Sequence, residues 1–185
     1  MDLEQEKELV CRAKNDTQAF GELYDEYYSQ IFGYVLRRTA RIDAAQDVTS
    51  EVFFKALKNI KKYRWRGVPF SAWLYRIATN EIANNFRRNK RRQLLTEEVM
   101  NSASDLNTSA AAEIAQAEAD IQKHKDFLAI HENTSRLPVK YQEVIVLRFF
   151  EKKQLKDIGI ILGKREGTIK SLLHRGLEKL RKLME

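Results

Sequence analysis

The sequence predicts an all-α protein made of two small helical domains joined by an acidic flexible linker. Only 7 Gly and 2 Pro interrupt its 185 residues, and apolar side chains recur at the three- and four-residue spacing of amphipathic helices. Residues 1–92 carry 18 basic and 12 acidic side chains, residues 93–121 carry 6 acidic and no basic ones, and residues 122–185 carry 15 basic and 8 acidic ones. We therefore expect domains at 1–95 and 122–185, with a linker at 96–121.

The amino-terminal domain is expected to contain two amphipathic helices before its central loop. In "TQAFGELYDEYYSQIFGYVLRR", helical spacing relates the apolar residues Phe20, Leu23, Tyr24, Tyr27, Ile31, Tyr34 and Val35. In the next helix, Asp43 and Gln46 fit a capping box, which places the helix start at Asp43. Its inner face is expected to carry Val48, Val52 and Leu57. The loop "YRWRGVP" then breaks the pattern, and Pro69 fits the first turn of the helix that follows.

That following helix, "FSAWLYRIATNEIANNFRRNKRR", has two contrasting faces. Its apolar stripe is expected to be buried and consists of Phe70, Trp73, Leu74 and Ile77. A polar ridge on the other side carries Arg76, Asn80, Asn84 and Arg88, widened by Arg87 and Arg91. Because amides hydrogen-bond base edges and clustered arginines hold phosphates, we expect this helix to read nucleic acid. Whether Asn80 contacts a base or only faces water stays open at this point.

The carboxy-terminal domain carries the pattern of a helix–turn–helix. Its first helix is expected to start at Pro138 and to run through Phe150. In "QLKDIGIILGKREGTIKSLLHRGLEKLRKLM", one helix ends at Gly163, which suits a left-handed C-terminal position, and another begins near Glu166. The second of these helices should direct outward Lys170, Ser171, His174 and Arg175. A helix that presents such side chains in its first turns fits the DNA major groove.

Composition argues against several other classes of protein. Cys11 is a single cysteine and the three histidines are scattered, so we expect no disulfide, no metal site and no cofactor. No glycine-rich phosphate loop, paired metal-binding carboxylates or nucleophile–base set is present, so we expect no catalytic residue and no enzyme. No apolar run is long enough to span a membrane, and we expect a cytoplasmic protein. A net charge of +7 favours a polyanionic partner.

Four segments, in this order, resemble the extracytoplasmic-function (ECF) sigma factors of the sigma-70 family. They are "DAAQDVTSEVFFKAL", "FSAWLYRIATNEIANNFRR", "LPVKYQEVIVLRFF" and "DIGIILGKREGTIKSLLHRGLEKLR". The resemblance implies a non-enzymatic subunit with regions 2 and 4 only, which binds core RNA polymerase and recognises and opens promoter DNA. It also implies contacts to the polymerase clamp helices and flap, and an anti-sigma factor as regulator.

The resemblance assigns three sets of site residues. The polymerase-binding set is Asp47, Ser50, Glu51 and Phe54, with Ser50 standing where the family usually has Gln. The set for the −10 element is Tyr63, Arg64, Trp65, Arg66, Arg76, Asn80, Asn84, Arg87, Arg88 and Arg91. The set for the −35 element is Arg165, Glu166, Thr168, Lys170, Ser171, His174 and Arg175. Leu172 stands where the family often has Arg, which should remove one contact to DNA.

Two other functions compete with this interpretation. A free-standing helix–turn–helix regulator explains the carboxy-terminal motif equally well, but it leaves the basic "NNFRRNKRR" unexplained. Tight, specific promoter binding without polymerase would favour that alternative. An enzyme that acts on nucleic acid is the third hypothesis, and magnesium-dependent cleavage by the pure protein would support it.

Overall fold

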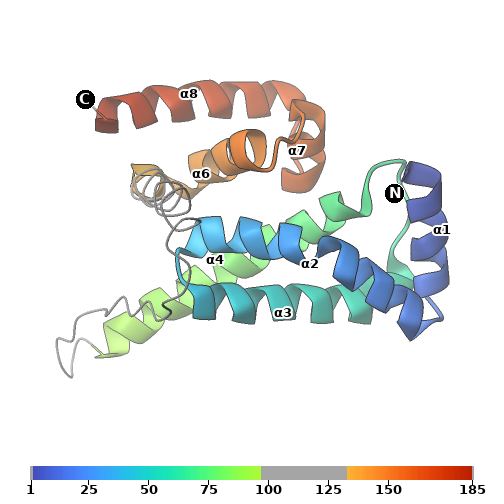
Figure 1. Cartoon of the computed structure of the whole chain (residues 1–185). Helices are drawn as coiled ribbons and strands as arrows, with labels where there is room; N and C mark the ends of the chain where they lie inside the picture. Colours follow the sequence, from blue (N-terminus) through green and yellow to red (C-terminus); the bar gives the residue numbers. More distant parts are fainter. Residues whose placement is uncertain (1, 97–132, 185) are drawn as a thin grey trace, which may run out of the picture.

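The computed structural model of the chain describes residues 2–96 and 133–184 (Figure 1). In the amino-terminal part, helices α1 (Leu3–Ala13), α2 (Thr17–Thr39) and α3 (Ile42–Asn59) precede a short 3-10 turn, η1 (Ile60–Lys62), and the long helix α4 (Phe70–Thr96). In the carboxy-terminal part, α6 (Val139–Ile145) continues as a π-helical turn, η2 (Val146–Phe150), before α7 (Leu155–Leu162) and α8 (Glu166–Met184). No strand occurs in these two ranges, and the all-α prediction is confirmed. The predicted linker lies outside them except for Thr96.

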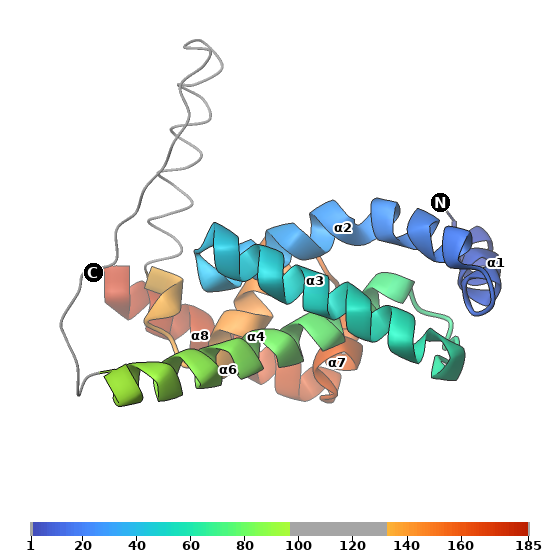
Figure 2. The same ribbon diagram turned by 90° about the horizontal axis from the view of Figure 1, so that it is seen from below.

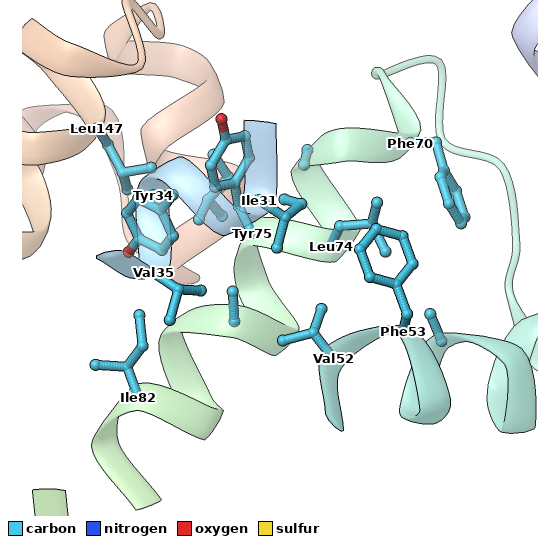
Figure 3. Packing of buried hydrophobic residues seen from close by; sticks show 14 of the residues in the cluster. Ile31, Tyr34, Val35, Val52, Phe53, Phe70, Leu74, Tyr75, Ile82 and Leu147 are labelled. Carbon is cyan, nitrogen blue, oxygen red and sulfur yellow. The ribbon is translucent and has the colours of Figure 1, made fainter. Parts of the chain in front are cut away.

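Helices α2, α3 and α4 run along one another, and α1 closes one end of this amino-terminal bundle (Figures 1 and 2). Their inward side chains form a continuous apolar core (Figure 3). One inner position was predicted wrongly, because Leu57 is 43% exposed. In the last turns of α3 the inner positions belong to Phe53 and Ala56 instead, and Leu57 lies about 100° further round the helix.

The start of α3 also differs from the prediction. The helix begins at Ile42 with Arg41 as its N-cap, and no side chain caps it. Asp43 lies inside the first turn, where its carboxylate accepts from the Arg41 guanidinium at 2.6 Å. Ala40 ends α2 in the left-handed conformation, so the connection to α3 is short and the helix starts before the capping-box pattern. The Asp43 carboxylate still suits a helix N-terminus, and its ion pair with Arg41 lowers the pKa of Asp43.

A buried carboxylate from α1 fixes the start of α4. Glu6 is 4% exposed and accepts hydrogen bonds from the backbone N–H of Phe70, at 2.8 Å, and from the Tyr27 hydroxyl. The Phe70 N–H is one of the donors that a helix start leaves without an intrahelical partner. Pro69 lies just before α4 rather than in its first turn. The loop between η1 and α4 is therefore tied at its end to α1.

Helices α6, α7 and α8 form a carboxy-terminal unit with a close turn between α7 and α8. Gly163 ends α7 at a φ of 64°, as the helix–turn–helix pattern predicted. Gly159 permits the turn because a Cβ there would lie 2.8 Å from the Lys164 carbonyl oxygen. The expected helix from Pro138 begins one residue later and changes to π-helical geometry at Val146. In α8, helical spacing predicted Leu177 on the inner side, but it is 39% exposed.

The carboxy-terminal unit packs on the amino-terminal bundle through α7 against α4 and η2 against α2 (Figure 1). Leu147 of η2 is fully buried next to Tyr34 of α2 (Figure 3). Beside them, Glu151 accepts hydrogen bonds from Arg37 Nε at 3.1 Å, from Arg37 Nη2 at 2.5 Å and from the Tyr75 hydroxyl at 2.5 Å. The Glu151 side chain is only 4% exposed. We call these three residues the Glu151 latch.

Candidate nucleic-acid interface

The polar ridge predicted on α4 is present, but its two central asparagines differ. Asn80 is exposed, and no hydrogen bond joins its side chain to any described residue. Asn84 is half-buried: its amide nitrogen donates to Glu81 at 3.2 Å, and its oxygen accepts from Arg87 at 2.5 Å. The exposed members of the ridge also include Arg76, Arg88 and Arg91. Among the described residues, the Asn80 amide therefore has no hydrogen-bond partner, whereas the Asn84 amide is held by Glu81 and Arg87 and keeps one N–H and one lone pair.

A hollow of about 270 Å³ lies between the loop before α4 and the first turns of that helix. Its aromatic walls are Tyr63 and Trp73, whose ring centroids lie 4.7 Å apart. The cations that line it are Lys62, Arg64, Arg66 and Arg76. Aromatic faces beside cations suit an unstacked base with its phosphate. Burial raises the pKa of Tyr63 to about 12, so its hydroxyl stays protonated at neutral pH.

Two details of this hollow were not predictable from the motif. Trp65 was expected in the reading loop, but it packs partly against the apolar core and does not line the hollow. Ile160 of α7 does line it, from the carboxy-terminal unit. The hollow is therefore partly covered while the two units are packed together.

The outward face of α8 matches the helix–turn–helix prediction. The exposed residues on it and on the turn before it include Arg165, Glu166, Thr168, Lys170, Ser171, His174 and Arg175. Lys170 pairs with Glu166 at 3.0 Å, and the Ser171 hydroxyl donates to the Gly167 carbonyl at 3.0 Å. The Lys170–Glu166 pair is solvent-exposed, so it contributes little to stability and leaves Lys170 available to phosphates.

The predicted polymerase-binding residues lie along α3. Asp47, Ser50 and Phe54 are exposed, and Glu51 is half-buried with its carboxylate 3.2 Å from Lys55 Nζ. Phe54 is 60% exposed, which is unusual for a phenylalanine in a folded protein. An exposed aromatic beside carboxylates on one helix is typical of a protein-binding surface.

Three functional candidates escaped the sequence analysis: Lys55, Glu81 and Glu151. Glu81 had a readable signal, because it is the only acidic residue of α4. Glu151 had none, since its partners Arg37 and Tyr75 are 114 and 76 positions away. Within residues 2–96 and 133–184, no cluster of His, Cys, Asp or Glu is suited to a metal ion. No helix in those ranges is long and apolar enough to cross a membrane.

Comparison with known proteins identifies the family. The sigma-70 region 2 family model matches residues 23–92, and the sigma-70 region 4 model matches residues 135–182. The chain is 32% identical to the ECF RNA polymerase sigma factor SigW of Bacillus subtilis, over 98% of this chain and 97% of that protein. It is also 32% identical to the ECF sigma factor BldN of Streptomyces coelicolor, over 96% of this chain and 65% of BldN.

Solved structures agree on the fold. The structure of CnrH, solved with the cytosolic domain of CnrY, aligns with a TM-score of 0.70 and 17% identity over 97% of this chain and 96% of that one. RpoE of Bartonella quintana, solved with the anti-sigma factor NepR, aligns with a TM-score of 0.65 and 19% identity, over 89% of this chain and 96% of that one. The family matches in both halves favour a sigma factor over a free-standing helix–turn–helix regulator. The chain belongs to the ECF RNA polymerase sigma factors.

Proposed function

We propose that this sigma factor directs core RNA polymerase to its promoters by using α3, α4 and α8 for three separate contacts. Helix α3 binds polymerase, α4 reads and helps to open the −10 element, and α8 reads the −35 element. The observation that carries the proposal is that one chain presents two exposed basic faces, on α4 and on α8, in the order of sigma regions 2 and 4. As in its relatives, which are sigma factors and not enzymes, no reaction is assigned to the chain.

At the −10 element, the α4 ridge contacts base edges and phosphates, and the hollow holds an unstacked base. The free amide of Asn80 can donate to and accept from a base edge, and Arg88 and Arg91 can hold phosphates. A base that leaves the stack can enter between Tyr63 and Arg66, where an aromatic face and a cation lie together. Stacking on an aromatic ring tolerates any base, so sequence choice in this proposal depends on the amides of Asn80 and Asn84.

At the −35 element, the first turns of α8 enter the major groove. Arg165, before the helix, and Arg175, two turns along it, are both exposed and form no ion pair within the described residues. Guanidinium groups bind guanine edges in a bidentate manner and also bind phosphates. The hydroxyl of Ser171 and the ring of His174 lie on the same exposed face and complete the set.

The polymerase contact uses Phe54 as an apolar anchor with Asp47, Ser50 and Glu51 around it. Polymerase clamp helices are the proposed partner of this surface, and the flap is the proposed partner of the carboxy-terminal unit. Because RNA polymerase acts in the cytoplasm, we infer that this protein acts there too. Buried aromatic residues dominate many protein interfaces, so truncation of Phe54 should weaken this contact most.

The packed arrangement of the two units is proposed to be the form that is not engaged with a promoter. Ile160 lines the −10 hollow, and the Arg76 guanidinium lies beside Gly163 at the turn of the helix–turn–helix. Both elements need to be free for their DNA contacts, so promoter binding requires the units to separate. An anti-sigma factor that holds the units together would keep the protein inactive; RpoE was solved with the anti-sigma factor NepR, and CnrH with the cytosolic domain of CnrY.

The test is transcription by core RNA polymerase with the purified protein on a genomic DNA library, followed by mapping of start sites. We expect start sites that share −10 and −35 sequences and that require the protein. Glu22→Gln serves as a control, because Glu22 forms an exposed pair with Arg12 outside all three contacts. The proposal is wrong if core polymerase gains no specific initiation from the protein. Tight, specific promoter binding by the protein without polymerase would instead support a free-standing regulator.

A further inference from the structure

A chain of polar contacts crosses from the polymerase-binding helix to the DNA-reading helix. Lys55 of α3 places its Nζ 3.2 Å from Glu51 on its own helix and 2.7 Å from Glu81 on α4. Glu81 in turn accepts from the Asn84 amide, which accepts from Arg87. The structure therefore links a predicted polymerase contact to two predicted DNA contacts through two residues, Lys55 and Glu81, that belong to neither set.

Glu81 is an unusual residue for its place. It is the only acidic side chain in α4, on a helix whose exposed charges are otherwise basic. A carboxylate beside DNA phosphates is repelled by them, so it needs either a base to read or an internal partner. Glutamate can accept from the amino group of cytosine, so direct base reading is one explanation for its presence.

The surroundings of Glu81 favour the internal partner. Its side chain is 9% exposed, and both carboxylate oxygens are occupied: Oε2 by Lys55 and Oε1 by Asn84. The hydrogen bond to Glu81 raises the pKa of Lys55, so the lysine remains a cation in this contact. A mostly buried carboxylate that is held from two sides is fixed in place, and burial leaves little of either oxygen accessible to a base.

The same residues border one groove between α3 and α4, with a volume of about 390 Å³. Among the residues that line it are Asp47, Glu51, Glu81, Asn84 and Arg88. The predicted polymerase contacts on α3 and the predicted DNA contacts on α4 therefore face one groove, and Glu81 lies on its α4 wall. A change in the position of Lys55 alters contacts on both helices, because its Nζ pairs with Glu51 of α3 and Glu81 of α4.

We propose that Glu81 is a positioning residue for −10 recognition, held by Lys55, which decides how the Asn84 amide and the Arg87 guanidinium are presented to DNA. This inference rests on the proposed function and deepens it. When polymerase binds Glu51, Lys55 loses one of its two carboxylate partners. The Lys55 ammonium then pairs with Glu81 alone. Binding of polymerase then strengthens the Lys55–Glu81 contact, which reinforces the positions that Asn84 and Arg87 already have in the free protein.

The test compares Glu81→Gln, Lys55→Met and the double variant in the full chain. With core polymerase and promoters randomised at the −10 element, both single variants should change relative initiation at the same base position by about fivefold or more. The double variant should match either single one, because both remove the same link. Lys55→Arg should restore the original base preference, since it keeps the cation. Affinity for core polymerase, measured separately, should stay within about twofold of the original.

A second measurement separates this inference from the proposed function, because it needs no polymerase. The side-chain NH2 resonances of Asn84, followed by NMR in the free protein, should move toward those of an unbonded amide in Glu81→Leu, which has no acceptor. Unchanged resonances would overturn the inference even if the protein is a sigma factor. Additive effects of the two single variants, or unaltered base preference in both, would also overturn it. A loss of cytosine preference in Glu81→Gln but not in Lys55→Met would show that Glu81 reads the base directly.

Discussion

Loss of the charge on Glu151 should open the protein. In Glu151→Gln the side chain keeps its size and one oxygen acceptor, but the three hydrogen bonds donated by Arg37 and Tyr75 lose their anionic acceptor. Hydrogen bonds to an anionic and to a neutral acceptor differ by about 1 kcal/mol each, which gives about 3 kcal/mol for three. Arg37 is 27% exposed and can recover part of this from water, so we expect a net loss of about 2 kcal/mol. That corresponds to a shift of roughly 30-fold in the equilibrium between packed and separated units.

Energy transfer between two dyes measures this equilibrium directly. Cys11 is the only cysteine, so Cys11→Ser followed by Lys58→Cys on α3 and Lys179→Cys on α8 gives one exposed label in each unit. At low urea concentrations, both forms are populated. There the ratio of separated units (low energy transfer) to packed units (high energy transfer) should be roughly 30-fold higher in Glu151→Gln than in the unmodified protein. Glu22→Gln removes the charge from an exposed ion pair within the amino-terminal bundle and should change nothing. An identical ratio in Glu151→Gln and the unmodified protein at every urea concentration would refute the latch.

The remaining predictions concern the turn, the two interfaces and pH. Gly159→Ala forces a Cβ to 2.8 Å from the Lys164 carbonyl and should cost about 1–3 kcal/mol of unfolding free energy in thermal denaturation, whereas Gly167→Ala, with nothing within 4 Å, should be neutral or stabilising. Arg175→Ala should reduce transcription from promoters with a −35 element at least fivefold without loss of affinity for core polymerase. Glu51→Ala should do the reverse, and an unaffected polymerase affinity would contradict its role. Above pH of about 10, where tyrosine ionises in the unfolded chain, the native state keeps the Tyr63 proton up to about 12 and binds more protons than the unfolded state. The unfolding free energy should therefore fall as pH rises through that window, as checked by urea titrations at pH 9, 10 and 11.

Local patterns in the sequence predicted the parts of the fold that depend on near neighbours. Gly163 ends α7 in the left-handed conformation, and the start of α8 at Glu166 follows from it, because both depend on residues within one or two turns. Asp43 failed as a cap for a reason that is equally local but was not visible in the pattern. Its neighbour Arg41 uses the same carboxylate, and the short connection after Ala40 starts the helix earlier.

In the candidate site, too, the features that depend on near neighbours were predictable, and those that depend on another helix were not. Helical spacing placed Arg88 and Arg175 on exposed faces, because the direction of a side chain on a helix follows from its position alone. It did not distinguish Asn80 from Asn84, since that difference depends on Glu81 and on Lys55 from another helix. The roles of both asparagines at a promoter, and of α3 at polymerase, stay predictions.

The Glu151 latch joins residues that the ribosome makes at different times. Arg37 and Tyr75 belong to the first part of the chain, and Glu151 follows the end of α4 at Thr96 by 55 positions. At a synthesis rate of roughly 5–20 residues per second, those positions take about 3–11 seconds to make. During that interval the amino-terminal bundle can fold while its latch partners still face water. Each new chain therefore passes through a stage at which Arg37 and Tyr75 have been made but Glu151, which closes the latch, has not.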